Sequence, residues 1–213
     1  MITDIILPAL GETLFMVLIS TALAVIVGFI PAIIMIITAK DGLKPNETVY
    51  KVLDTIINIL RSLPFIILMV ILIPVTRFIV GKSIGTTAAI VPLTIGSAPF
   101  VTRIIESSLR EVDKGVIEAA KSFGASTSQI IFKVMLPEAL PSIISGITLT
   151  IISVVGFSAM AGAIGAGGLG NVAITYGYQM FKQDVLIATV VVLIVLVQGF
   201  QSIGNLIYRK VNK

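Results

Sequence analysis

Long apolar runs separated by short polar breaks dominate this chain. The first run is uncharged from Thr13 to Ala39, and about 20 apolar residues suffice for a helix to cross a bilayer. Four more runs of sufficient length follow, at about Val52–Val75, between Lys82 and Arg103, at Ile143–Met160, and between Asp184 and Arg209. The pattern predicts an all-α, polytopic membrane protein with five transmembrane helices.

The start of the first run and the segment after the fourth need separate interpretation. Asp4 and Glu12 precede the first run and no basic segment does, so the run is expected to be a retained helix rather than a cleaved signal peptide. After the fourth run, residues 161–178 contain many glycines and make a poor spanning helix. We expect the backbone to turn back there and pack closely near the end of that span.

Composition supports a membrane protein and excludes several kinds of chemistry. Of the 213 residues, 56% are hydrophobic and 12% are charged, with a mean hydropathy of +1.09. Soluble domains carry about 25% charged residues. The sequence has no cysteine and no histidine, which excludes disulfides, thiolate metal sites, histidine ligands and Ser-His-Asp triads.

The basic residues indicate an orientation. If the N-terminus lies outside the cell membrane and five helices cross it, the C-terminus is cytoplasmic. All but three of the 15 basic residues then lie on the cytoplasmic side, the exceptions being Arg77, Lys82 and Lys182. This bias follows the positive-inside rule, so the net charge of +4 is attributed to the membrane topology and not to nucleic-acid binding.

Many of the charges gather at residues 103–138, a segment too long for a plain turn between spans. Asp113 is placed to cap a helix through Phe123, and Gly124 follows as a C′ glycine. Ser126 and Gln129 have capping-box spacing for a second helix, expected to stop near Pro137.

The first of these short helices is expected to be amphipathic. Val116, Ala120 and Phe123 share one face of it. Two interpretations remain open: an amphipathic hairpin lying on lipid headgroups, or a docking element for a cytoplasmic partner.

The same segment resembles a known signature. Glu118-Ala119-Ala120, then three residues, Gly124, nine residues and Val134-Met135-Leu136-Pro137 resemble the EAA motif of ABC importer permeases, EAA-x3-G-x9-I-x-LP. The one departure is Val134 in place of isoleucine. The resemblance implies a type I importer fold over residues 1–213, with coupling helices at about 103–138 that dock on a separate ATPase. The coupling residues it implies are Glu118, Ala119, Ala120, Gly124, Leu136 and Pro137.

Other segments are similar to the methionine-importer subgroup, namely residues 61–65, 89–94 and 162–170. That similarity implies a second copy of the chain, two ATPase subunits that bind ATP and Mg²⁺, and an extracytoplasmic methionine-binding lipoprotein. A permease for another amino acid or small zwitterion is the nearest alternative, and a channel-like membrane protein is a further one. Residues 165–170 match G-x-G-x-x-G, but they follow an apolar helix and not a strand, so no dinucleotide site is expected.

Four residues are candidates for the transport pathway or its gate. Arg61 is the charge that lies well inside a span, near its expected cytoplasmic end, so it could either anchor the helix or act in gating. Met160 lies among small residues at the end of the fourth span, and in a homodimer two copies could close an apolar gate. Ser153 and Ser158 could line the same path, or could serve as interhelical hydrogen-bond donors.

Overall fold

The computed structural model describes residues 2–212, and these are almost entirely helical, with no strand among them. The elements are α1 (Ile2–Thr38), α2 (Glu47–Ser62), α3 (Phe65–Ile71), α4 (Ile73–Val80), α5 (Thr86–Arg110), α6 (Lys114–Ser122), α7 (Thr127–Gln129), π-helical η1 (Ile130–Met135), α8 (Leu136–Ala163), α9 (Gly168–Val172), π-helical η2 (Ala173–Gln179) and α10 (Gln183–Val211).

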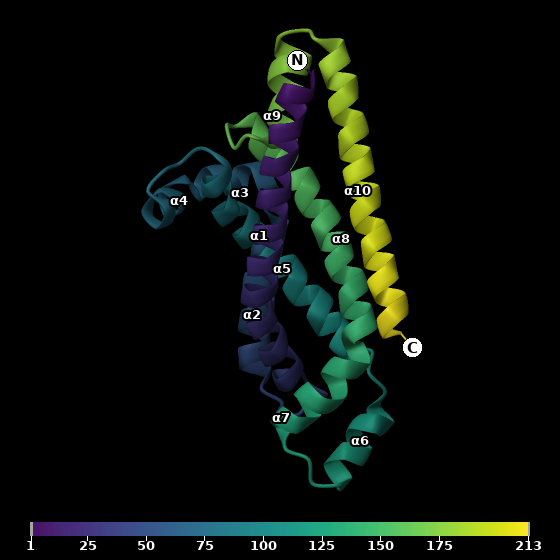
Figure 1. Cartoon of the computed structure of the whole chain (residues 1–213). Coiled ribbons are helices and arrows are strands. Elements are labelled where there is room, and N and C mark those ends of the chain that lie inside the picture. Colours follow the sequence, from purple (N-terminus) through teal and green to yellow (C-terminus); the bar gives the residue numbers. More distant parts are fainter. Residues whose placement is uncertain (1, 213) are drawn as a thin grey trace.

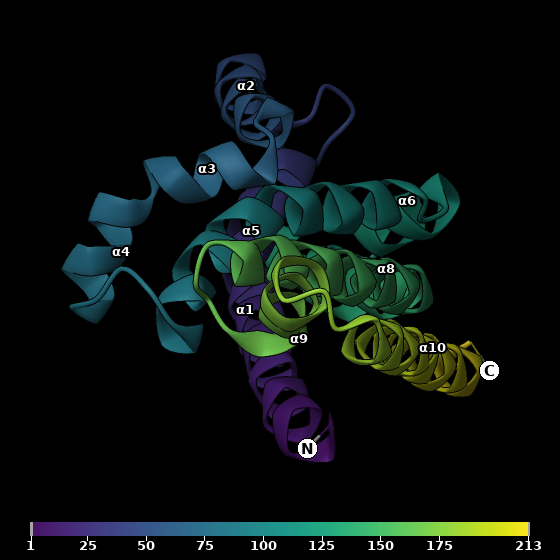
Figure 2. The same cartoon turned by 90° about the horizontal axis from the view of Figure 1, so that it is seen from above.

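Four long helices form the body of the molecule (Figure 1). The helix α1 packs on α5, α5 packs on α8, and α8 packs on α10. The N-terminus lies at one end of this bundle, and α6 and α7 lie at the other, which we call the α6 end. Seen from above, α3 and α4 project away from the bundle on the side opposite α10 (Figure 2).

Four of the predicted spans are continuous helices that are long and apolar enough to cross a membrane: α1, α5, the stretch Thr127–Ala163, and α10. The second predicted span is not continuous. The helices α2 and α3 meet at an angle of 103°, and they make the fifth span only if the bent pair is counted as one. Leu63 has an extended backbone before Pro64, the conformation that a following proline favours.

The first predicted span starts earlier than its charge-free run. The helix α1 already includes Asp4 and Glu12. The Glu12 side chain has a partner within the protein, because its Oε2 accepts a hydrogen bond of 2.6 Å from the Gly168 amide. The neighbouring Thr13 hydroxyl accepts one of 2.9 Å from the Leu169 amide.

These two hydrogen bonds fix the glycine-rich segment against α1, and they confirm that this segment turns back after α8. Gly165, Gly167 and Gly168 all have positive φ, between 76° and 94°, a region that side chains with a Cβ rarely adopt. The turn lets α9 and η2 pack beside α1, α8 and α10 without crossing the bundle again.

The expected helix end at Pro137 is wrong. The chain remains helical from Thr127 to Ala163, and Pro137 lies in the first turn of α8. The six residues before α8 form the π-helical segment η1. Within this continuous helix Pro137 has no N–H to donate to a preceding carbonyl, and the wider π turn of η1 directly before it accommodates the missing bond.

Three layers of buried apolar residues run along the bundle. The layer nearest the α6 end joins α1, α5, η1 and α8 through residues such as Ile105, Leu109, Ile131 and Met135. A middle layer contains Met16, Phe65, Leu93 and Val154. The third, near the N-terminus, joins α1 to α9 and α10 through Leu169 and Val185. The middle layer and the layer near the N-terminus share Leu193 and Leu196 of α10 as packing partners.

Candidate coupling hairpin and transport groove

The hairpin formed by α6 and α7 is built from local capping interactions, and these confirm the expected caps. Asp113 Oδ1 accepts a hydrogen bond of 2.6 Å from the Gly115 amide at the start of α6. Ser126 and Gln129 make a complete capping box at the start of α7. Gly124 has a φ of +76°, and the Ala125 amide donates back into α6, so the chain reverses within a few residues.

The apolar side chains of α6 serve two different surfaces. Ile117 and Ala120 pack against the core layer at the α6 end. Phe123, expected on the same face as Ala120, is 92% exposed, and Val116 is also exposed. The apolar stripe is therefore divided: one part attaches α6 to the bundle, and the other faces away from the chain.

Most of the motif residues of the hairpin are exposed. Glu118 and Ala119 are exposed, and Ala120 is half-buried. Gly124 is exposed at the tip of the hairpin. Leu136 packs against the core at the start of α8, while Pro137 is exposed. The structure thus presents Glu118, Ala119 and Gly124 together on one short exposed hairpin.

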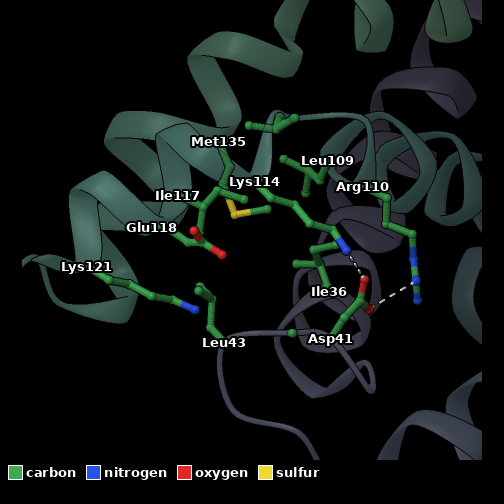
Figure 3. Close-up of a pocket in the computed structure, with 12 residues that line it drawn as sticks. Ile36, Asp41, Leu43, Leu109, Arg110, Lys114, Ile117, Glu118, Lys121 and Met135 are labelled. Atoms are coloured by element: carbon green, nitrogen blue, oxygen red, sulfur yellow. Dashed lines mark ion pairs between the residues drawn. The ribbon is translucent and has the colours of Figure 1, made fainter.

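Loop 39–46, between α1 and α2, fastens the hairpin to the bundle (Figure 3). The Asp41 carboxylate pairs with Lys114 Nζ at 3.4 Å and with Arg110 Nη1 at 3.6 Å. A cavity of about 100 Å³ lies between this loop and α6, lined by Glu118 and Ile117 among others. A backbone hydrogen bond, aided by Lys114 and Arg110, lowers the pKa of Asp41 despite an opposing contribution from burial.

A network of charged and polar side chains extends from that loop to α2. Its centre is Glu106 on α5, whose side chain is 4% exposed. Glu106 accepts hydrogen bonds from Tyr50 Oη at 2.9 Å, from Arg103 Nη1 at 2.8 Å, and from Arg110 Nη2 at 3.1 Å. Arg103 also pairs with Asp54 on α2.

This network clamps α2 to α5, and sequence reasoning missed it. The spacing of Arg103, Glu106 and Arg110 at i, i+3 and i+7 was a usable signal, since it places all three on one helix face. Residues 103–110 belong to the last turns of α5. Their partners on α2 could not be assigned from spacing alone.

Three cavities follow each other between α5 and α8. A cavity of about 260 Å³ is lined by Arg61 and Phe100, and the same two residues line the next, of about 420 Å³. That second cavity shares Ser108, Glu111 and Ser142 with a third, of about 520 Å³, which reaches the α6 end. We call this series the α5–α8 groove.

The groove places two of the four candidate pathway residues together. Arg61 on α2 and Ser153 on α8 both line its innermost cavity. Met160 lies two turns further along α8 and is 48% exposed. Ser158 is buried, and its hydroxyl donates to the Val155 carbonyl. The structure therefore brings Arg61 and Ser153 together, with Met160 beyond them on the same side of α8.

Arg61 lies near the end of α2, against α5. Its guanidinium lies over the Phe100 ring at 5.9 Å, and Phe100 is about 15 Å along α5 from Arg110. The helix α2 packs on α5 and ends just after Arg61. Arg61 therefore lies level with the middle of α5.

Comparison with known proteins identifies the family. Residues 24–213 match the model of the binding-protein-dependent transport system inner membrane component family. The chain is 51% identical over 210 residues to a probable D-methionine transport system permease protein, MetI, of Vibrio cholerae, covering 99% of this chain and 93% of that protein. It is 50% identical to the methionine import system permease protein MetP of Bacillus subtilis, covering 84% of this chain and 81% of that one.

Solved structures agree with these matches. A chain from inward-facing conformations of the MetNI methionine ABC transporter superposes with a TM-score of 0.97 at 43% identity, covering 99% of this chain and 98% of that one. An amino acid ABC transporter at 21% identity shares the fold, with a TM-score of 0.73. The chain therefore belongs to the binding-protein-dependent transport system inner membrane components and is a membrane-spanning permease subunit of an ABC importer.

Proposed function

We propose that this chain forms the translocation pathway of a methionine importer. Two copies would pair in the membrane, two ATPase subunits would bind at the α6 end, and an extracytoplasmic methionine-binding lipoprotein would deliver the substrate. The observation that carries this proposal is the exposed α6 hairpin in a chain 51% identical to a D-methionine permease. ATP and Mg²⁺ would bind to the ATPase partner.

The hairpin is suited to dock on another protein. Phe123 and Val116 are exposed apolar side chains of the hairpin, and α6 lies at one end of the molecule (Figure 1). Glu118 and Lys121 are charged and exposed beside them. Apolar anchors with a charged rim are the composition of protein interfaces. We infer that Glu118, Ala119, Ala120 and Gly124 form the contact with the ATPase.

The contacts between the hairpin and the bundle determine which helices would move when the hairpin moves. Asp41 ties α6 to α5 and loop 39–46, and α7 continues through η1 into α8 without a break. Closure of the ATPases on ATP would therefore rotate α8 directly through α7, whereas α5 is linked to α6 through the short loop 111–113 and the Asp41 ion pairs. Rigid-body rotation of this kind alternates access between the two sides of the membrane.

The α5–α8 groove is the proposed route on the cytoplasmic side. It opens at the α6 end and narrows toward Arg61 and Ser153. Met160 lies beyond the groove, and its partly exposed apolar side chain is available to meet the same residue of a second copy. We propose that Met160 closes the pathway, with Ser158 hydrogen-bonded to the Val155 carbonyl behind it. The N-terminus would then be outside and the C-terminus cytoplasmic.

Reconstitution tests this proposal. The chain is co-expressed with its ATPase partner and a methionine-binding lipoprotein, and uptake of radiolabelled methionine into proteoliposomes is measured with and without ATP. Gly124→Asp is expected to abolish ATPase co-purification and uptake, because a Cβ at a φ of +76° is strained and the added charge lies at the hairpin tip.

Ser202→Asp is a matched control, because Ser202 is also exposed but lies on α10. It should leave ATPase co-purification intact. If Gly124→Asp retains both the ATPase and methionine uptake, the hairpin is not the coupling contact. If the wild-type complex transports another amino acid and not methionine, the substrate assignment is wrong.

A further inference from the structure

The Arg61 side chain lies level with the middle of α5, is exposed in the single chain, and has no acidic partner among residues 2–212. Its described contact is the face of the Phe100 ring. A charge inside a spanning segment usually faces a water-filled path and is found mostly where a substrate or ion passes. The cation–π contact with Phe100 holds the guanidinium beside the cavity but leaves its hydrogen-bond donors available.

A second group in the same cavity also has no partner. The Ser97 hydroxyl is buried, with the residue 1% exposed, and no group in the described chain forms a hydrogen bond with it. Ser97 precedes Phe100 by one turn on α5, so both lie on the face toward Arg61. Buried hydroxyls normally have a partner, and its absence points to one that is not part of the chain.

The walls of this cavity suit an amphipathic solute. Phe65 and Phe157 stack with ring centroids 4.6 Å apart, and both line the cavity with Leu68. Among the described lining residues, Arg61 is the charged one. The volume of about 260 Å³ is close to the lower limit of about 300 Å³ for small-molecule sites. The arrangement offers a guanidinium and a hydroxyl at one place and apolar surface around them.

We propose that Arg61 and Ser97 form a transit site that binds the carboxylate of the transported amino acid, while its apolar side chain lies against Phe65 and Phe157. This inference rests on the proposed function for the identity of the solute. A guanidinium and a hydroxyl are the donors that a carboxylate requires. The lining has no acidic residue for the ammonium group, so binding is weak and release into the wider groove is easy.

Protection from alkylation tests the site directly, because the chain has no native cysteine. Ser153→Cys places a thiol in the cavity wall. In the complex with the ATPase and without the lipoprotein, millimolar methionine should slow alkylation several-fold. Methioninol, which lacks the carboxylate, should not. Ser145→Cys, lower in the groove and outside this cavity, should be alkylated at an unchanged rate.

Three second-site variants complete the test. Adding Arg61→Gln or Ser97→Ala to Ser153→Cys should raise the methionine concentration needed for half-maximal protection at least about tenfold, since each removes a donor to a charged group. Adding Arg61→Lys should restore part of it. Protection by methioninol equal to that by methionine, or protection that survives both removals, would overturn the proposal, as would no protection by methionine.

Failure of this site and failure of the proposed function give different results. If wild-type uptake of methionine and ATPase co-purification are normal but the Ser153→Cys thiol is never protected, the permease assignment stands and the transit site is refuted. If uptake of methionine is absent, protection is measured with the amino acid that the complex does transport. If Arg61→Gln fails to assemble, Ser97→Ala, which removes one oxygen atom, decides the outcome.

Discussion

Glu106 is the residue whose replacement should most affect how α2 packs on α5. Its carboxylate accepts hydrogen bonds from Tyr50, Arg103 and Arg110, and it is almost fully buried. We consider Glu106→Ala, which leaves two guanidinium groups and a phenol without their shared acceptor. Arg103 retains Asp54 and Arg110 retains Asp41, so neither cation is left entirely unpaired.

The expected cost follows from these contacts. Removal of one partner from a fully buried ion pair costs about 3–5 kcal/mol. The Arg103 and Arg110 side chains are 21% and 38% exposed, so water and the remaining carboxylates compensate in part. We expect roughly 2–3 kcal/mol, which corresponds to about a 30- to 150-fold change in the equilibrium for opening α2 from α5.

Hydrogen exchange of the α2 backbone amides in the assembled complex measures this opening. Glu106→Ala should accelerate exchange of residues 52–58 by the factor given above. A double-mutant cycle with Tyr50→Phe should give a coupling energy of about 1 kcal/mol, the value of one hydrogen bond. Glu47→Gln is the control, because Glu47 lies on the same helix in a largely exposed pair with Lys51.

The control should leave exchange unchanged, since exposed pairs contribute little. If Glu106→Ala changes α2 exchange less than threefold, the network does not hold α2 on α5, and apolar packing alone is sufficient. If Glu47→Gln gives the same acceleration as Glu106→Ala, the effect belongs to helix propensity and not to the buried network.

Three other predictions concern the hairpin and the gate. The pKa of Asp41 is lowered in the folded protein, so its charged form stabilises the fold above the ordinary pKa of about 3.9, and this stabilisation is lost as pH falls through the folded pKa. We therefore expect loop 39–46 to become sensitive to protease below about pH 4. Asp41→Asn should make the loop protease-sensitive already at about pH 7. Ser126→Ala should weaken α7 by about 1 kcal/mol, and faster amide exchange at residues 127–129 would confirm it. Met160→Ala should raise the methionine-independent leak of proteoliposomes, while an unchanged leak would assign Met160 to packing.

The sequence predicted local features of the hairpin best. The caps at Asp113 and Ser126 and the reversal at Gly124 depend on residues within four positions of each other. Such interactions can be derived from spacing because the backbone geometry of a helix end is fixed. The five apolar runs were also visible, since bilayer thickness sets their length.

Features that depend on distant residues were not predictable. Tyr50 and Glu106 are 56 positions apart, and only packing of α2 on α5 brings them together. The division of the apolar face of α6 could not be predicted for a related reason. Ala120 and Phe123 share that face by helical periodicity, but Ala120 packs on the core whereas Phe123 faces outward. The bend at Pro64 could not be predicted from the hydropathy pattern, because the apolar run continues on both sides of it.

The geometry of α8 connects the hairpin to the cavity at Arg61. Ser153 lies about 40 Å along a continuous helical path from Ser126. Tilting such a helix by roughly 10° about the α6 end displaces Ser153 by about 7 Å, from its rise of about 1.5 Å per residue. Arg61 would not move in the same way, because α2 is clamped to α5 through Glu106 and ends at the bend. A small rotation of the hairpin would therefore change the distance between Ser153 and Arg61 by more than the hairpin itself moves, and so open or close the innermost cavity.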